Sequence, residues 1–520
     1  MVAASAGFLV FSVVAMSCII IVGCVLMLIT FGHPDDRVGA WFPKLVTLAG
    51  FYLSFASILA LPLDVANSRL GAGLDMTAIW TTIFICIIVM VVIIVPYAFF
   101  FYESDTSPDA GQGAGAAWTG QAGTALQYTV IAFIVFGLIL GLMYFYEDTA
   151  TITLSWQKRE ANLANFSQVY PPTSVQASGG KFICKSQDIA PMSCNNSTGQ
   201  WTTNVSFLVF CGAIISFIGW FFFMFFCSIG LIALPIDLIN EFRTRPVRMT
   251  VQEYAKEKIA VGKRASTLLA MAQELQKNKT NLDRAVSRKN RRSDREIQNR
   301  LEAEVQRLKH DKRMLEVSYH QKGGNPVVYF AKLNAGLLGL SLSCTWFVQI
   351  CVFLLPVVKN PFLNVLFMDL SLPGFSLMGD MAFGFYSMYL ILCCIKGVFR
   401  LGLRIPWCLR VYPMEIGNTM MNAFLFNTWL TLICTIPVVQ FCVINFSMYA
   451  NDTSVRGIFG TQIFYLSFFR MIFYHDAYIF AMFAIMFVTV VAMVADPKDK
   501  ALEIEKKLKV FEKEDLENNV

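Results

Sequence analysis

The sequence predicts an all-α, polytopic integral membrane protein with about nine transmembrane helices and a cytosolic helical hairpin between spans five and six. Its 520 residues are 56% hydrophobic and only 15% charged, which leaves too little polar surface for a soluble protein of this length. Several apolar stretches reach the roughly 20 residues that a helix needs to cross a hydrocarbon core about 30 Å thick. Unbroken apolar runs such as 81–95 exclude the alternating strands of a membrane β-barrel.

Nine predicted spans divide the chain into six regions. The spans cover residues 8–30, 45–63, 78–101, 124–146, 205–235, 328–356, 376–399, 419–446 and 472–495. The regions are 1–147 with spans one to four, 148–204 as an extracytosolic loop, 205–240 with span five, 241–326 as a cytosolic basic hairpin, 327–495 with spans six to nine, and 496–520 as a cytosolic tail. We interpret the first stretch as a retained span, because it is too long for a signal peptide and lacks a basic segment before it.

The distribution of basic residues predicts the orientation. Residues 241–322 hold 21 of the 42 Lys and Arg residues against 11 acids, and basic loops stay in the cytosol. The turn 399–411 carries Arg400, Arg404 and Arg410 without an acid, and it lies two spans further along. With nine spans, the N-terminus then lies outside and the C-terminus lies in the cytosol. The predicted location is the plasma membrane or an endolysosomal membrane.

The loop 148–204 has the features of an extracytosolic, oxidising compartment. Most of the 14 cysteines lie within spans, where they fit as small buried hydrophobic residues. Cys184 and Cys194 lie in this loop instead, and we predict that they form a disulfide. Sequons for N-glycosylation also fall on the predicted outer side. The candidate acceptors are Asn165, Asn195, Asn196 and Asn451.

Residues 250–320 are predicted to form a helical hairpin. Thr250 followed by Glu253 matches a capping box, and so does Ser293 followed by Glu296. Apolar residues in the second half recur at helical spacing along one seam, as in a coiled coil. They are Ile297, Leu301, Val305, Leu308 and Leu315. We interpret the segment either as a solvated hairpin with a basic face or as a docking arm for a protein partner or for anionic lipid head groups.

Residue patterns for catalysis are not evident. The four His residues show no pair at metal-ligand spacing, and the chain lacks a Walker A loop, a dinucleotide fingerprint and a nucleophile elbow. We therefore predict no enzymatic activity, no cofactor, no metal site and no nucleic-acid partner. Ionisable groups in or near spans either face the bundle interior or cap its interfaces. The candidates are Asp64, Glu103, Asp237, Lys332, Asp380 and Lys396.

Short strings spread along the chain add a family resemblance. They are His33-Pro34-Asp35-Asp36 with Trp41–Lys44, Leu61–Asn67, Phe99–Glu103, Leu234–Ile239 with Arg245-Pro246, and Met421–Asn427. In this order they resemble the limb-region-1-like (LMBR-like) family of membrane proteins, to which the lipocalin-interacting membrane receptor (LIMR) belongs. The resemblance implies nine spans, an outside N-terminus and no enzymatic activity. It also implies a receptor, escort or signalling adaptor, without specifying a ligand.

Two classes of function remain open. The first is a non-catalytic receptor, escort or trafficking or signalling adaptor, which contacts membrane lipids and binds protein partners, a second copy of the chain among them, through the outer loop and the hairpin. The alternative is a transporter or channel for a lipid or small solute, indicated by Asp380, Lys396 and the prolines within or ending spans. Those prolines are Pro62, Pro96, Pro235 and Pro437. A continuous polar cavity through the bundle would favour the transporter.

Overall fold

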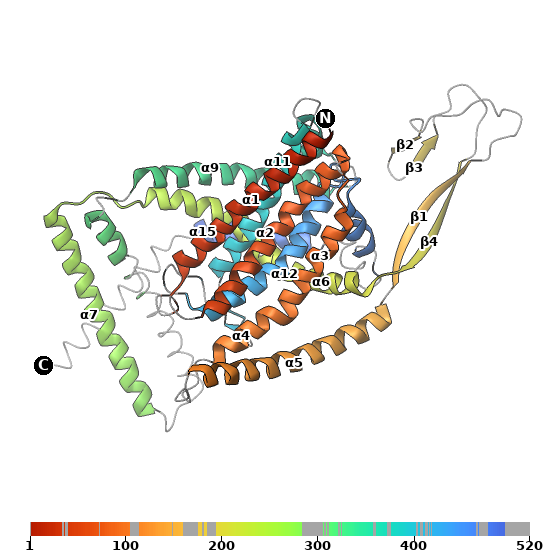
Figure 1. The fold of residues 1–520 in the computed structure, drawn as a ribbon. Helices are drawn as coiled ribbons and strands as arrows, with labels where there is room; N and C mark the ends of the chain where they lie inside the picture. Colours follow the sequence, from red (N-terminus) through yellow and green to blue (C-terminus); the bar gives the residue numbers. More distant parts are fainter. Residues whose placement is uncertain are drawn as a thin grey trace, which may run out of the picture. The chain divides into compact units, whose positions relative to one another are not determined.

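Helices make up most of the structure, a computed structural model of the chain (Figure 1). The residues described are 2–33, 36, 40–71, 73–104, 114–147, 149–159, 175–178, 181–184, 194–282, 305, 308, 311–320, 323, 325–356, 360–371, 376–401, 404–405, 409–410, 414, 417, 419–463, 466 and 477–494.

Eight helical segments within these ranges are long and apolar enough to cross a membrane, and they coincide with the first eight predicted spans. Their elements are α1 (Val2–Phe31), α2 (Trp41–Leu70), α3 (Met76–Val89) with η2 (Met90–Ile94) and α4 (Val95–Ser104), α5 (Ala114–Glu147), α6 (Phe207–Arg243), α9 (Pro326–Gln349) with η5 (Ile350–Leu354), α11 (Ser376–Leu401) and α12 (Met421–Asn445). The predicted all-α, polytopic class is therefore confirmed.

The ninth predicted span corresponds to α15 (Ala477–Val494). Its apolar part, Ala477–Met493, is shorter than the other eight spans. The predicted span starts at residue 472, and residues 467–476 lie outside the described part of the chain. The total of nine spans therefore stays a prediction.

Strands occupy part of the region that the sequence analysis treated as a loop. Long strands β1 (Thr149–Arg159) and β4 (Cys194–Asn204) pair in antiparallel register, from Thr149 opposite Asn204 to Arg159 opposite Cys194. Shorter antiparallel pairs are formed by β2 (Val175–Ser178) with β3 (Lys181–Cys184), and by β5 (Arg404–Ile405) with β6 (Leu409–Arg410). The alternation of Thr with Ala, Ile and Leu after residue 149 is typical of a strand, and this signal was missed.

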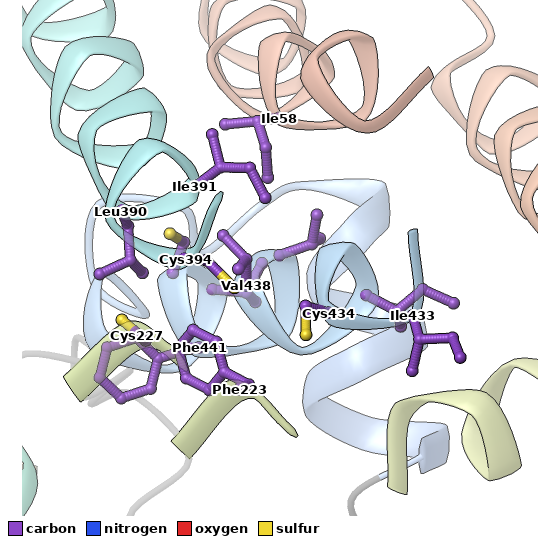
Figure 2. Packing of buried hydrophobic residues seen from close by; sticks show 14 of the residues in the cluster. Ile58, Phe223, Cys227, Leu390, Ile391, Cys394, Ile433, Cys434, Val438 and Phe441 are labelled. Carbon is purple, nitrogen blue, oxygen red and sulfur yellow. The ribbon is translucent and has the colours of Figure 1, made fainter. Parts of the chain in front are cut away.

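Helix α12 forms the centre of the bundle, since nearly all of its side chains are buried, whereas few of the described side chains of α1 and α5 are buried. Figure 2 shows its residues Val438 and Phe441 among side chains of α2, α6 and α11. A Cβ at Gly219 of α6 would clash with α12, and one at Gly230 would clash with the α11 backbone. Small residues at these crossings allow the helices to approach closely, as is common in membrane bundles.

A π-helical turn explains how Pro96 fits within a span. In η2 the N–H of Val95 donates to the carbonyl of Met90, five residues back. The next such bond would run from residue 96 to Val91, but proline has no N–H. The indole Nε1 of Trp429 in α12 donates to this Val91 carbonyl instead, over 3.0 Å. The free carbonyl is thus satisfied by a neighbouring helix, as backbone inside a membrane requires.

The chain divides into two compact units, residues 1–234 with 341–520, and residues 235–340. The second unit holds the end of α6, helix α7 (Val251–Leu282), helical residues 311–320 and the start of α9. The predicted capping box of α7 is confirmed, because the Thr250 N–H donates to the Glu253 carboxylate over 2.9 Å and the Glu253 N–H to the Thr250 hydroxyl over 3.4 Å. These hydrogen bonds lower the pKa of Glu253.

Ring contacts and an ion pair join α7 to residues 311–320. The rings of Tyr254 and Tyr319 stack with their centroids 4.2 Å apart, and Arg264 lies 3.8 Å from Asp311. Because the later α7 residue meets the earlier residue of the second segment, the two run antiparallel. This arrangement supports the predicted hairpin, although the second capping box, Ser293 with Glu296, lies outside the described residues.

Candidate functional site

Polar side chains from three helical segments, α2, α10 (Phe362–Leu370) and α11, converge on Tyr449, in the turn after α12. Its hydroxyl donates to Oδ1 of Asp380 over 2.7 Å and lies 3.1 Å from the Ser371 hydroxyl. The guanidinium of Arg69 lies 3.8 Å from the centre of the Tyr449 ring. Burial and the charge of Asp380 raise the pKa of Tyr449, so its hydroxyl stays protonated and donates. We call Arg69, Asn364, Ser371, Asp380 and Tyr449 the Tyr449 cluster.

Amide side chains hold the backbone on which this cluster is built. The Asn364 side chain, in α10, accepts from the Tyr449 N–H over 3.1 Å and donates to the Asn445 carbonyl over 3.2 Å. Gln349 donates to the same carbonyl over 3.1 Å. The end of α12 is therefore tied to both α9 and α10, and Tyr449 is held in one position.

Asp64 of α2 is 1% exposed and caps the neighbouring helical turns α13 (Ser454–Arg456) and η6 (Gly457–Ile463). Its carboxylate accepts from the Val455 N–H over 2.9 Å, from the Ser454 N–H over 3.3 Å and from the Trp80 indole over 2.9 Å. A carboxylate at a helix N-terminus is stabilised by unpaired N–H groups there. Together with Arg69, it fixes segment 449–455 to α2.

A second polar cluster lies at the N-terminus of α12. The Asp36 carboxylate accepts from the Tyr102 hydroxyl over 3.0 Å and from the Met421 N–H over 3.1 Å. The amide of Asn422 donates to Glu103 over 3.1 Å. Three of the strings that carry the family resemblance, 33–36, 99–103 and 421–427, thus meet at one place. We call Asp36, Tyr102, Glu103, Met421 and Asn422 the Asp36 cluster.

The other ionisable candidates are at helix ends. Lys332 of α9 forms an ion pair with Glu241 of α6 at 2.6 Å. Asp237 and Lys396 are half-buried in α6 and α11, and each makes a further interaction. Asp64 and Asp380 both hold the segment after α12, whereas Glu103 belongs to the Asp36 cluster.

A family model described as LMBR1-like membrane protein matches residues 5–323. A LIMR family protein of Dictyostelium discoideum is 31% identical over 518 residues, which cover 96% of this chain and 99% of that protein. The chain belongs to the LMBR1-like membrane protein family. A LIMR family protein of rice is 32% identical over 471 residues, which cover 85% of this chain and 87% of its own. The resemblance that the short strings indicated is therefore confirmed.

Two further comparisons do not specify the function of this LMBR1-like protein. A CASP-like protein of Selaginella moellendorffii is 38% identical over 108 residues, which cover 21% of this LMBR1-like chain and 53% of that protein. No solved structure matches the chain.

No sequence pattern indicated the residues that organise both clusters of this LMBR1-like protein. Arg69, Trp80 and Tyr449 carry no motif, and only the fold brings them to Asp64 and Asp380. Asp36 and Tyr102 were part of the family strings, but nothing in those strings indicated that the two side chains touch. The only available signal was their position at span ends, where polar side chains are expected to cap interfaces.

The predicted disulfide remains a prediction. Cys184 is the last residue of β3 and Cys194 the first residue of β4, so the two belong to different strand pairs. Asn195 and Asn196 follow in β4.

The other predicted glycosylation sites also remain predictions. Asn451 lies in the turn after α12, where it is exposed. Asn165 lies outside the described residues.

Proposed function

We propose that this LMBR1-like protein is a non-catalytic membrane receptor, escort or trafficking or signalling adaptor, whose bundle is a packed scaffold. The observation that carries the proposal is the use of its buried carboxylates. Asp64 accepts from the Trp80 indole of α3 and from two N–H groups of α13, and Asp380 accepts from Tyr449. Both are engaged in joining helices.

The depth of the ionisable groups supports the same proposal. Asp380 is the fifth residue of α11, Asp64 is six residues before the end of α2, and Lys396 is five before the end of α11. At 1.5 Å per residue, each lies within about 10 Å of a helix end. Coupled transporters instead place titratable groups near the midplane.

The polar stripe of α12 is also explained without a pathway. The hydroxyls of Thr428, Thr431 and Thr435 each donate to the backbone carbonyl four residues earlier, over 2.8 Å. The Asn427 amide does the same to Ala423. Such bonds satisfy these donors within their own helix, so the donors need no water-filled lumen.

Partner binding is assigned to the two regions outside the bundle, the segment 148–204 and the hairpin 241–326. In the first, the paired strands β1 and β4 present Trp201 with 58% of its surface exposed, and a two-stranded sheet offers unpaired edges for a further strand. In the second, α7 exposes charged side chains between residues 253 and 264. We further propose that the first region is extracytosolic and the second cytosolic.

The test is recovery of bound proteins from native membranes. Residues 255–318 are replaced with a short Gly-Ser linker, and the proteins that co-purify with the full chain and with the variant are compared by mass spectrometry. We expect the variant to remain inserted and to lose a defined subset of partners. An identical set of partners for both proteins would contradict the role of the hairpin.

A second measurement distinguishes this scaffold from the alternative, a transporter or channel. The purified full chain is placed in liposomes, and flux of lipid or small solutes is measured with and without Asp380→Asn. Flux that depends on Asp380 would overturn the scaffold proposal in favour of a transporter.

A further inference from the structure

Helix α7 is tethered close to the membrane at its start. Seven residues separate the end of α6 at Arg243 from Val251, and an extended chain of this length spans at most about 25 Å. The antiparallel segment 311–320 leads back to α9 at Pro326 after only five residues. The chain thus holds the base of the hairpin beside two membrane spans.

Within the unit 235–340, the direction of α7 differs from that of the end of α6 and the start of α9. The ends of α6 and α9 lie side by side, joined by the Lys332–Glu241 ion pair and by the close approach of Gly336 to Ile239. Figure 1 shows α7 running crosswise to both of them. The hairpin therefore leaves the line of the two helix ends that tether it.

One face of α7 carries an apolar strip that its neighbouring segment leaves exposed. Val251, Ile259 and Leu269 are 66%, 62% and 62% exposed, and at about 100° per residue they fall within one 80° sector. Small residues, Ala255 and Gly262, fill the positions between them. The face toward 311–320 is a different one, marked by the half-buried Tyr254 and its contact with Tyr319.

Charges are sorted around this strip. Exposed lysines flank it, with Lys258 about 50° to one side of its centre and Lys263 and Lys256 about 90° and 110° to the other. The acids Glu253 and Glu257 lie about 150–170° away, on the opposite face, where Arg264 also lies and pairs with Asp311. An apolar strip between lysines, with acids behind, is typical of helices that lie in a membrane interface.

We infer that α7 lies on the bilayer, with the strip Val251–Leu269 inserted among anionic lipid head groups and its flanking lysines on their phosphates. A protein partner for the strip is less favoured, because 311–320 already packs on α7 and because the tether keeps the bilayer at high effective concentration. Anionic lipids gather on the cytosolic leaflet, which is the predicted side of the hairpin. This inference goes beyond the proposed function, since it holds whether or not the hairpin also binds a protein.

The experiment uses the purified full chain in lipid nanodiscs. An environment-sensitive dansyl amino acid is placed at Ile259 in one preparation and at Glu257, on the acidic face, in the other. Each is measured in discs of phosphatidylcholine alone and of phosphatidylcholine with phosphatidylserine. We expect the emission of the probe at 259 to move to shorter wavelengths in the anionic discs and to return as salt is added, whereas the probe at 257 stays water-like throughout.

Charge variants provide the controls. K256E/K258E/K263E should abolish the shift at position 259, whereas K312E/R313E, which reverses two charges on the other segment, should preserve it. A water-like probe at 259 in both kinds of disc would overturn the inference and favour a protein partner for the strip. A shift that is insensitive to salt and to lipid charge would also overturn it. The salt titration tests whether α7 binds anionic lipid even where the triple variant folds poorly.

Discussion

The hydroxyl of Tyr449 donates to the carboxylate of Asp380 over 2.7 Å, and this bond joins the turn after α12 to the first turns of α11. The two residues are 3% and 4% exposed. Gly379 makes the contact sterically feasible, because a Cβ there would lie 2.8 Å from the Tyr449 oxygen. A charge that could have indicated an ion path is therefore a joint between two helices.

We expect Tyr449→Phe to destabilise the protein by about 1–3 kcal/mol, because it leaves the buried Asp380 carboxylate without its donor. Asp380→Asn should cost less, since an amide oxygen can still accept from Tyr449. Thermal unfolding of purified protein in detergent measures both. Tyr128→Phe, at a ring that is 60% exposed, is the matched control. Equal stability of Tyr449→Phe and wild type would show that the bond contributes nothing.

Asp64→Ala should cost at least about 3 kcal/mol, because it leaves the Trp80 indole and two backbone N–H groups unpaired. Asp64→Asn retains one acceptor oxygen and should cost less. Hydrogen exchange should speed up in peptides covering residues 449–463, while peptides from the centre of α12 stay protected. Unchanged exchange in 449–463 would mean that Asp64 does not hold this segment.

Trp429→Phe should destabilise the bundle by about 1–3 kcal/mol, because the Val91 carbonyl loses its donor. Pro96→Ala supplies an N–H that can bond to the same carbonyl. The double variant should therefore be more stable than Trp429→Phe alone. A double-mutant cycle of thermal unfolding tests this coupling. Additive effects of the two substitutions would refute the link between Trp429 and Pro96.

Cys184 and Cys194 should be linked in protein prepared without reductant. Nine residues lie between them, so the closed loop should stabilise the segment by somewhat less than the roughly 3 kcal/mol expected for a 15-residue loop. Mass spectrometry of a non-reduced digest should find the cross-linked peptides. Free thiols at both positions in fresh protein would rule the disulfide out.

The predicted orientation can be checked in sealed vesicles whose cytosolic face is outward. Added protease should cut residues 283–300 and leave residues 160–174 intact. Endoglycosidase treatment of cell membranes should lower the mass of the wild-type protein. Asn451→Gln should remove part of that shift, because this exposed residue is a predicted acceptor. Protection of 283–300 with cleavage of 160–174 would mean that the topology is inverted.

Features that depend on neighbouring residues in the chain were predictable. Apolar length located the first eight spans, because crossing a bilayer is a property of one continuous segment. The capping box of Thr250 and Glu253 was predictable for the same reason, since its two hydrogen bonds join residues three apart.

Tertiary structure alone decided which polar groups meet. Asp36 accepts from Met421 and Asp64 from Val455, and no local pattern specifies partners nearly 400 residues apart. The same applies to Trp429, whose indole completes a backbone interrupted by Pro96 in another helix. Hydropathy determines that a segment enters the membrane, because that free energy is a sum over its own residues. The pairing of buried polar groups depends on which helices pack together, because each unpaired donor or acceptor must find its partner across the bundle.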